Sequence, residues 1–365
     1  MSDFQTISVL SSLVWGRMRQ SRSLTAMLKI ATGLLVVAGL LTLMADNFWL
    51  ADLAANLRFQ LVMAGSVGLA AAVLLKHRVL AAVQLLLLMF HGSWFLHPVE
   101  CAPHAVGPAD VTVTTINVYR MNLQYDRISS ALRKQSADVI AVLEICDALL
   151  DHLRKELAGS HPYVLARPQN DGNFGIAIFS AFPLDNAEIF SLSGSSPSLT
   201  ASVCIRERSC RVIATHPMSP MNSRNFDSRN RHLRQLGERI QTWRDSEPLV
   251  AMVLMGDLNL TPWSPHFAAF QQASGLVRTS GPFDVKATWY AGPSFIFGLT
   301  IDHCLVTPEF FCVTHTVGSD VGSDHRPVTV GLMLDTEITE QMQEFVHRSM
   351  SLTVRPCQQD EVPQS

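Results

Sequence analysis

Charged residues are scarce in this chain. They make up 16% of its 365 residues, whereas hydrophobic residues make up 48%, a balance typical of proteins with membrane segments. The formal net charge is −3, which argues against a nucleic-acid binder held by an overall basic surface. The sequence also has no internal repeat or low-complexity tract. Its length is sufficient for one large domain and a second part.

The hydrophobic residues are concentrated in the first quarter of the chain. They form three blocks at about 24–43, 59–75 and 79–95. Blocks of this length are at or above the lower limit for crossing roughly 30 Å of hydrocarbon. The pattern predicts an N-terminal all-α membrane anchor, 1–96, with three transmembrane helices. The alternative is a signal peptide followed by buried helices, although a signal peptide has a single apolar region.

Polar residues inside and beside these blocks refine the prediction. Gln84 and His91 interrupt the third block and are expected to face neighbouring helices or the membrane interface. Basic residues precede or enter the first block, at Arg17, Arg19, Arg22 and Lys29, and a "KHR" turn occupies 76–78. By the positive-inside rule, the N-terminus and this turn are cytoplasmic. Three crossings then place everything after residue 97 on the extracytoplasmic side.

The chain has seven cysteines, and a disulfide among them would agree with an extracytoplasmic location of the second part. The segment "VCIRERSC" suggests a hairpin with a three-residue loop that places Cys204 opposite Cys210. The segment "CLVTPEFFC" suggests the same for Cys304 and Cys312 about Pro308. Cross-strand neighbours lie near disulfide distance, so we expect at least one pair to be oxidised, as an extracytoplasmic compartment permits. The alternative is buried free thiols.

The rest of the chain has a different character. Residues 97–110 contain prolines and show no helical periodicity, which predicts a linker. From Val111, short β-branched runs alternate with helical stretches, and this pattern predicts a mixed α and β catalytic domain over 111–334. The polar segment 335–365 is expected to be a tail that frays from a helix into disorder.

Six apolar strands of this domain end in polar, chemically active residues. One of these ends is "GDLN", where Asp257 and Asn259 lie two residues apart. Side chains at this spacing point in the same direction in a strand. Asp and Asn are also ordinary turn residues, which is the alternative at any single strand. The complete set is Asn117, Glu144, His216, Asp257 with Asn259, Asp302, and Asp324 with His325. Together these residues suit a hard cation and phosphoryl transfer.

The motifs around these residues carry a resemblance. "INVY", "DVIAVLE", "ATH", "GDLN", "IDHCLV" and "GSDHRPV" occur in an order and at spacings that resemble the endonuclease/exonuclease/phosphatase superfamily over about 111–334. The N-terminal spans and "GDLNLTPWSP" are similar to its membrane-anchored, VanJ-like bacterial branch. The resemblance implies a DNase-like, four-layer α/β sandwich of two sheets with the site at one edge. It also implies a multi-pass protein of the bacterial inner membrane.

Roles for the residues follow from the same resemblance. Glu144 would bind Mg²⁺, with Mn²⁺ as a second possibility, and Asn117 and Asp324 would lie close to the ion or its waters. Asp257 would orient or deprotonate the attacking water, and Asn259 would hold the phosphate. His325, oriented by Asp302, would donate to the scissile phosphoryl group, and His216 would do so from the other side.

Three further residues are candidates for substrate binding. Arg229 and Asn230, on an Arg-rich helix, are interpreted as phosphate or headgroup contacts, the alternative being a solvated helix face. Asn173 in "DGNFGIAIFS" matches a position near the substrate, the alternative being turn chemistry. The sequence departs from many nuclease relatives at Leu143, where those have Gln before the metal-binding Glu.

The function predicted from these features is hydrolysis of a phosphoester bond by a membrane-tethered, Mg²⁺-dependent phosphoesterase. The substrate is expected to be a lipid-linked or headgroup phosphate, because a tether raises the effective concentration of membrane substrates. The alternative is a membrane-anchored nuclease acting on extracytoplasmic DNA or RNA. A third hypothesis is a non-catalytic binding protein, which the retention of Glu144, Asp257, Asn259, Asp324 and His325 disfavours.

Overall fold

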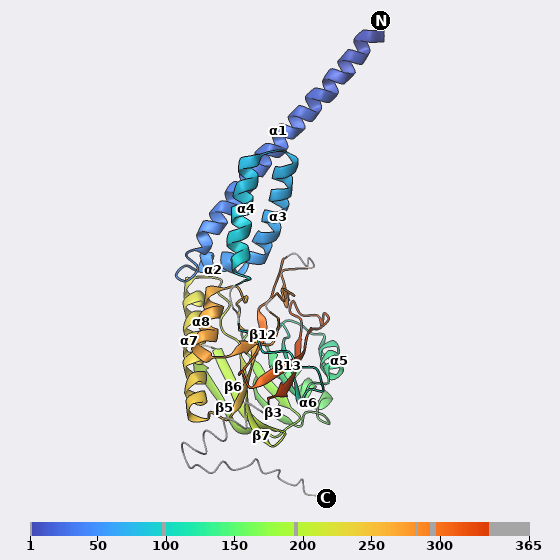
Figure 1. The fold of residues 1–365 in the computed structure, drawn as a ribbon. Helices are drawn as coiled ribbons and strands as arrows, with labels where there is room; N and C mark the ends of the chain where they lie inside the picture. The colour runs from blue at the N-terminus through green and yellow to red at the C-terminus, as the bar shows by residue number, and fades with distance from the viewer. Residues whose placement is uncertain (1, 97–99, 193–195, 282, 293–296, 336–365) are drawn as a thin grey trace, which may run out of the picture. The chain divides into compact units, whose positions relative to one another are not determined.

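The computed structural model describes residues 2–96, 100–192, 196–281, 283–292 and 297–335, with side chains from residue 22 onward (Figure 1). The chain divides into two compact units, Met1–His97 and Pro98–Ser365. Each unit has its own set of internal contacts.

The first unit is helical. Its helices are α1 (Ser2–Thr42), α2 (Trp49–Asn56), α3 (Arg58–Leu74) and α4 (Arg78–Ser93). Of the described residues, only the stretch Arg22–Thr42 of α1 is by itself long and apolar enough to cross a membrane. α2 and α3 reach that length only together, across a bend of 63°, and α4 has 16 residues.

The prediction of three transmembrane helices is therefore not confirmed for the described part of the chain. One helix has the required length, or two if the bent pair counts as one span. The predicted turn at 76–78 is present, with a left-handed φ of 56° at Lys76, but α3 with 17 residues and α4 with 16 are each too short to count as a span by themselves. Gln84 of α4 is buried and its Nε2 donates to Thr32 Oγ1 of α1 at 2.9 Å, so it faces a neighbouring helix as expected.

Two six-stranded sheets make up most of the second unit. The first sheet has the order β13-β14-β1-β2-β4-β3 and comprises β1 (Val111–Asn117), β2 (Val139–Leu143), β3 (Tyr163–Arg167), β4 (Ile176–Ser180), β13 (Phe310–Val317) and β14 (Val328–Leu334). The second has the order β5-β6-β7-β8-β12-β9 and comprises β5 (Asp185–Leu192), β6 (Ser196–Ile205), β7 (Arg208–Thr215), β8 (Ala251–Asp257), β9 (Val277–Arg278) and β12 (Asp302–Val306). A short hairpin pairs β10 (Trp289–Tyr290) with β11 (Gly298–Leu299).

Helices cover the outer face of each sheet. α5 (Tyr125–Gln135) and α6 (Asp147–Glu156) pack on the first sheet, and α7 (Ser223–Ser246) and α8 (Pro265–Ser274) pack on the second. The central strands are apolar on both faces because each face is covered. In β8, for example, Val253 faces the other sheet and Leu254 faces α7 and α8. The predicted two-sheet sandwich with four layers is confirmed.

Strand register brings the polar strand ends together. β1 and β2 run parallel with Asn117 beside Leu143, so Glu144 follows directly next to Asn117. β7 and β8 are also parallel, which places His216 next to the end of β8. β12 is antiparallel to β8 and pairs Asp302 with Asp257. One end of the sandwich therefore collects polar residues from both sheets.

The predicted linker, 97–110, is corrected over residues 100–110, which are part of the second unit. Ala102 N donates to Arg278 O of β9 at 2.7 Å, and Pro103 O accepts from Cys312 N of β13 at 2.9 Å. β13 is an edge strand of the first sheet and β9 is an edge strand of the second, and edge strands have backbone groups available for a further segment. Residues 97–99 and the tail from 336 to 365 lie outside the described residues.

The hairpin between β6 and β7 differs by one residue from the prediction. Its turn has two residues, Arg206 and Glu207, with left-handed φ values of 47° and 64°, as such tight hairpin turns require. This register pairs Cys204 with Ser209 instead of Cys210. Successive side chains of a strand point to opposite faces, so a bridge between Cys204 and Cys210 is excluded here.

The second predicted cysteine pair is also corrected. Cys304 lies on β12 of the second sheet, whereas Cys312 lies on β13 of the first, so the two do not share a hairpin. Both side chains, with that of Cys210, are buried in the core between the sheets. All three are free thiols, which was the alternative interpretation of the sequence.

Candidate active site

Seven of the predicted site residues lie at the end of the sandwich where polar strand ends meet. Asn117 and Glu144 come from the first sheet, His216, Asp257 and Asp302 from the second, and Asp324 and His325 from the segment before β14. All are buried except Asp324, which is half-buried. Hydrogen bonds and ion pairs connect six of them directly, and Asp324 joins this cluster through Ser323, whose Oγ contacts Asp324 Oδ1 at 3.4 Å and donates to Asn117 O at 2.8 Å.

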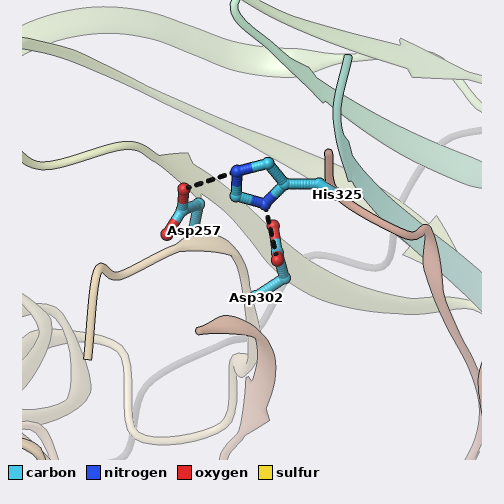
Figure 2. A group of neighbouring side chains, drawn as sticks. All are labelled: Asp257, Asp302 and His325. Atoms are coloured by element: carbon cyan, nitrogen blue, oxygen red, sulfur yellow. Dashed lines mark hydrogen bonds and ion pairs between the residues drawn. The ribbon is translucent and has the colours of Figure 1, made fainter. Parts of the chain in front are cut away.

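His325 lies between two carboxylates (Figure 2). Its Nδ1 donates to Asp302 Oδ2 at 2.8 Å, and its Nε2 is 3.7 Å from Asp257 Oδ2. Burial alone would lower the pKa of His325, but the charge and hydrogen bond of Asp302 and the charge of Asp257 outweigh it and raise the pKa to about 10. The imidazole therefore carries a proton on each nitrogen and has one of them available at the Asp257 side.

His216 approaches the same carboxylate from another direction. Its Nε2 is 3.5 Å from Asp257 Oδ2. Burial would raise the pKa of Asp257, but the hydrogen bond to His216 and the charges of His325 and His216 lower it to about 2. For His216, burial lowers the pKa and Asp257 raises it, with a net increase. Asp257 is thus an ionised carboxylate held between two imidazoles.

Asn117 connects the two sheets within the site. Its Nδ2 donates to Glu144 Oε1 at 3.1 Å and to Asp257 Oδ2 at 3.3 Å. The other oxygen of Glu144, Oε2, accepts from Arg120 N at 3.1 Å. Glu144 itself has a left-handed φ of 61°, a conformation that is rare for a non-glycine residue and common at functional sites.

Trp289 holds Asp324 and was missed by sequence reasoning. Its indole Nε1 donates to Asp324 Oδ2 at 2.9 Å, and its backbone pairs with His325 in an isolated bridge. Tyr290 N also donates to Asp324 O at 2.9 Å. The hairpin β10–β11 therefore fixes the segment that carries Asp324 and His325. A two-residue strand has no periodicity, so the sequence pattern gave no signal for it.

The "GDLN" turn serves both as a turn and as a part of the site. Asn259 has a left-handed φ of 52°, and its N donates to Asp257 Oδ1 at 2.9 Å, which is ordinary Asx-turn chemistry. Its Nδ2 donates to Pro217 O at 3.1 Å, next to His216. The turn thereby aligns Asp257 with the segment that follows β7.

Arg229 of α7 donates a hydrogen bond to this turn. It is fully buried, and its Nη1 donates to Asn259 O at 3.1 Å. Its Nε and Nη2 donate to Asn230 Oδ1, and Asn230 Nδ2 lies 3.3 Å from His266 Nε2. A direct contact of Arg229 with a substrate stays a prediction, and in this structure its guanidinium is fully buried and hydrogen-bonded to Asn259 O and Asn230 Oδ1.

Asn173 lies at the edge of the site region. It is exposed in the loop between β3 and β4. Its neighbour Phe174 packs against the ring of His216, with ring centroids 5.8 Å apart. In the described part of the chain, this loop contacts the cluster through Phe174.

A buried hydrogen-bond network next to His216 was also not predicted from the sequence. His232 of α7 is hydrogen-bonded through Nε2 to Thr215 Oγ1 at 2.8 Å and through Nδ1 to Ser196 Oγ at 3.2 Å. Burial, with a contribution from the charge of His216, lowers the pKa of His232 to about 4. The network fixes the end of β7, and a histidine inside an amphipathic helix gave no sequence signal for it.

The residues of the site fit a divalent cation. Asp257, Asp302 and His325 offer ligand atoms within 4.8 Å of one another, but His325 Nδ1 is hydrogen-bonded to Asp302 and its Nε2 faces Asp257 in an ion pair at 3.7 Å. Glu144 and Asp324 offer oxygens, the ligands that Mg²⁺ prefers. With Asp257 and Asp302, they bring four carboxylates against two imidazoles, so a cation would balance the surplus negative charge.

Comparison by sequence shows the family. Residues 114–325, more than half of the chain, match the family model described as Endonuclease/Exonuclease/phosphatase family. The chain therefore belongs to this family. No curated protein matched the chain.

Solved structures share the fold at low identity. The endonuclease/exonuclease/phosphatase from Beutenbergia cavernae DSM 12333 is 19% identical, with a TM-score of 0.51 over 61% of this chain and 71% of that one. TDP2 from C. elegans is 14% identical, with a TM-score of 0.51 over 61% and 75%. The mannosyl-6-phosphatase Bt3783 of Bacteroides thetaiotaomicron VPI-5482 is 16% identical, with a TM-score of 0.51 over 61% and 100%.

Family and site together define the class of protein. The family comprises nucleases and phosphatases, as its description states, and the chain retains a cluster of carboxylate, amide and imidazole groups at one edge of the sandwich. The protein is a phosphoester hydrolase.

Proposed function

We propose that the second unit hydrolyses a phosphoester on a lipid-linked or headgroup phosphate, with Mg²⁺ or Mn²⁺ as the cofactor. The observation that supports it best is the position of His325 between Asp302 and Asp257, with Asn117 linking Asp257 to Glu144. Phosphoryl transfer requires positioned groups and donors where negative charge develops, and this arrangement supplies both.

Each residue has a role in this proposal. Asp257, an ionised carboxylate at the centre of the cluster, orients the attacking water or accepts its proton. His325 and His216 donate to the phosphoryl oxygens from two sides, and Asp302 holds His325 in orientation. Asn259 helps to hold the phosphate next to the turn.

Glu144 is proposed as the residue that holds the cation, with Asn117 and Asp324 beside it. When bound, a divalent cation supplies positive charge that stabilises the developing charge on the phosphoryl oxygens. Asn117 orients Glu144 through one oxygen, and Arg120 N orients it through the other. Trp289 fixes Asp324 in the same way.

The proposed substrate class rests on the anchor. A helix long enough to span a membrane, Arg22–Thr42, would keep the site near lipid phosphates and raise their effective concentration. We propose a location in the bacterial inner membrane with the second unit on the extracytoplasmic side. The alternative is a membrane-anchored nuclease, which would use the same residues on DNA or RNA.

The experiment is a substrate panel with the full chain in detergent. Isoprenyl phosphate, phospholipids, p-nitrophenyl phosphate and plasmid DNA are each incubated with Mg²⁺, with Mn²⁺ and with a chelator. We expect release of phosphate or a headgroup from the lipids, loss of activity with chelator, and intact DNA. Rapid DNA cleavage with inert lipids would favour the nuclease, and turnover that survives chelation would contradict the cation.

Substitutions in the cluster test the site itself. Asp257→Ala and His325→Ala should each lower kcat by about 10²- to 10⁴-fold, because each removes a group that acts in the transition state. Thermal unfolding of each variant serves as the control for folding. Normal turnover in either variant would show that the site is wrongly assigned.

A further inference from the structure

The loops around the site carry an unusual share of the exposed apolar side chains. Among the described residues of the second unit, nine large hydrophobic side chains are exposed. Six of them belong to loops at the edge of the sandwich where the site lies: Tyr119, Met121, Leu123, Met221, Phe283 and Phe297. Isolated exposed hydrophobics are normal on a protein surface, but a group at one edge marks an interaction site.

The topology places these loops at the site. Residues 118–124 follow β1, which ends at Asn117, and residues 217–222 follow His216 directly. β9 is antiparallel to β12, so the chain leaving β9 runs toward Asp302 at the same edge. The hairpin β10–β11 that carries Phe297 also holds Asp324 through Trp289.

The charges in these loops help to decide between a nucleic acid and a lipid bilayer as the binding partner. Segments 118–124 and 217–222 contain no acidic residue, and their one basic residue, Arg120, donates through Nη1 to Asn170 O. A nucleic acid would need a row of cationic groups along its backbone, which these segments do not offer. The loop that carries Phe283 has one charge of each sign, Asp284 and Lys286. Leucine, methionine and aromatic side chains in loops with little net charge are a composition that enters the headgroup region of a bilayer.

We infer that these six residues, here called the apolar rim, dock the site onto the surface of a lipid bilayer. The inference deepens the proposed function and rests on it for the substrate class, because the rim would bring a lipid phosphate to the cluster without removing its chain from the membrane. The stretch Arg22–Thr42, which is long and apolar enough to span a membrane, would supply the high local concentration that lets a rim of a few side chains engage.

A crosslinking experiment tests the docking without any activity. The full chain is placed in phosphatidylcholine nanodiscs that include a phosphatidylcholine with a diazirine in its acyl chain, and crosslinked peptides are mapped by mass spectrometry. We expect crosslinks in α1, as the internal positive control, and in peptides that carry Leu123, Met221 and Phe297. Peptides of β5, which carry the exposed Ile189, should remain unlabelled. Labelling of α1 without the rim would overturn the inference even if lipid hydrolysis is observed.

A rate comparison tests the consequence. The triple variant Leu123→Ser, Met221→Ser, Phe297→Ser is compared with wild type on isoprenyl phosphate in nanodiscs and on soluble p-nitrophenyl phosphate. The ratio of the bilayer rate to the soluble rate should fall by about tenfold or more, since three apolar side chains lose their burial. Ile189→Ser, on the edge strand β5, is the matched control and should keep the wild-type ratio. An unchanged ratio of bilayer rate to soluble rate in the triple variant would contradict docking through the apolar rim. Inactivity of the wild type on every phosphoester would contradict the proposed function alone.

Discussion

At the scale of single residues, Trp289 shows how the site depends on a side chain that carries no reactive group. Its indole donates to Asp324 Oδ2, while its backbone pairs with His325. Loss of the indole N–H should leave Asp324 free to rotate away from the cluster. Trp289 is therefore a positioning residue in the proposed function.

Trp289→Phe should lower kcat by about tenfold, because a hydrogen bond to a charged group contributes about 1.5–3 kcal/mol. It should also raise the Mg²⁺ concentration needed for half-maximal rate, which a change in packing alone would not do. Tyr290→Phe is the matched control, since it removes a hydrogen bond to Ala287 O from the same strand and should change neither quantity by more than about twofold. An unchanged Mg²⁺ requirement in Trp289→Phe would show that Asp324 does not need this partner.

The residues that the sequence reveals are those that end an apolar strand. Buried apolar runs are interrupted by polar side chains at six positions: Asn117, Glu144, His216, Asp257, Asp302 and His325. Because a buried polar side chain is costly without a partner or a function, these positions indicate a site. Trp289 and His232 are different, because one lies in a two-residue strand and the other on an amphipathic helix. Their partners, Asp324 and Thr215, are known only once the tertiary structure is known.

At the scale of elements, the parallel pair β7–β8 sets the distance between His216 and Asp257. Gly256 lies opposite Thr215 in this pair. A Cβ atom at residue 256 would lie 2.0 Å from Thr215 O, a backbone atom that cannot move without the strand. The close approach of the two strands therefore requires glycine.

Gly256→Ala should destabilise the second unit by about 1–3 kcal/mol through overpacking, and it should lower kcat because the His216 side of the cluster shifts. Urea unfolding and the rate on p-nitrophenyl phosphate measure the two effects. Gly159→Ala is the control, because a Cβ there meets nothing within 4 Å, and it should stay within about 0.5 kcal/mol of wild type. Equal stability of the two variants would contradict the strand argument.

Other elements differ in how well the sequence predicted them. The sandwich was predictable from two sequence patterns, the continuous apolar runs of its central strands and the amphipathic pattern of its helices. Strands that are apolar on both faces must be covered on both faces, which predicts layers of sheets and helices. The hairpin at Arg206 was predicted one residue too long, because loop length depends on turn geometry that composition does not reveal. The blocks 59–75 and 79–95 and the turn between them were predicted nearly where α3 and α4 lie, but apolar length alone did not show that α2 and α3 meet at a bend of 63°.

At the scale of the whole molecule, buried histidines couple stability to pH. Burial lowers the pKa of His232 to about 4, of His303 to about 3 and of His315 to about 4. Each is neutral in the folded chain, whereas in the unfolded chain it takes up a proton below its ordinary pKa of 6.5. The stability that each contributes is therefore complete above pH 6.5 and is lost as the pH falls from 6.5 toward the folded pKa.

For His232 this coupling should amount to about 2 kcal/mol between pH 7.5 and pH 5. His232→Gln should be less stable than wild type at pH 7.5, since it loses the bonds to Thr215 and Ser196, but its stability should fall less on acidification. Urea unfolding in detergent at the two pH values, followed by circular dichroism, measures the difference. A parallel loss in wild type and variant would show that His232 does not titrate as expected.

The thiols between the two sheets affect the conditions under which the chain can fold. Burial raises the pKa of the Cys210 and Cys304 thiols, and it raises that of Cys312 to about 11. Protonated and enclosed sulfur neither attacks a disulfide nor meets an oxidant. The core between the two sheets therefore needs no disulfide to hold it together, and these three thiols would stay reduced in an oxidising as well as in a reducing compartment.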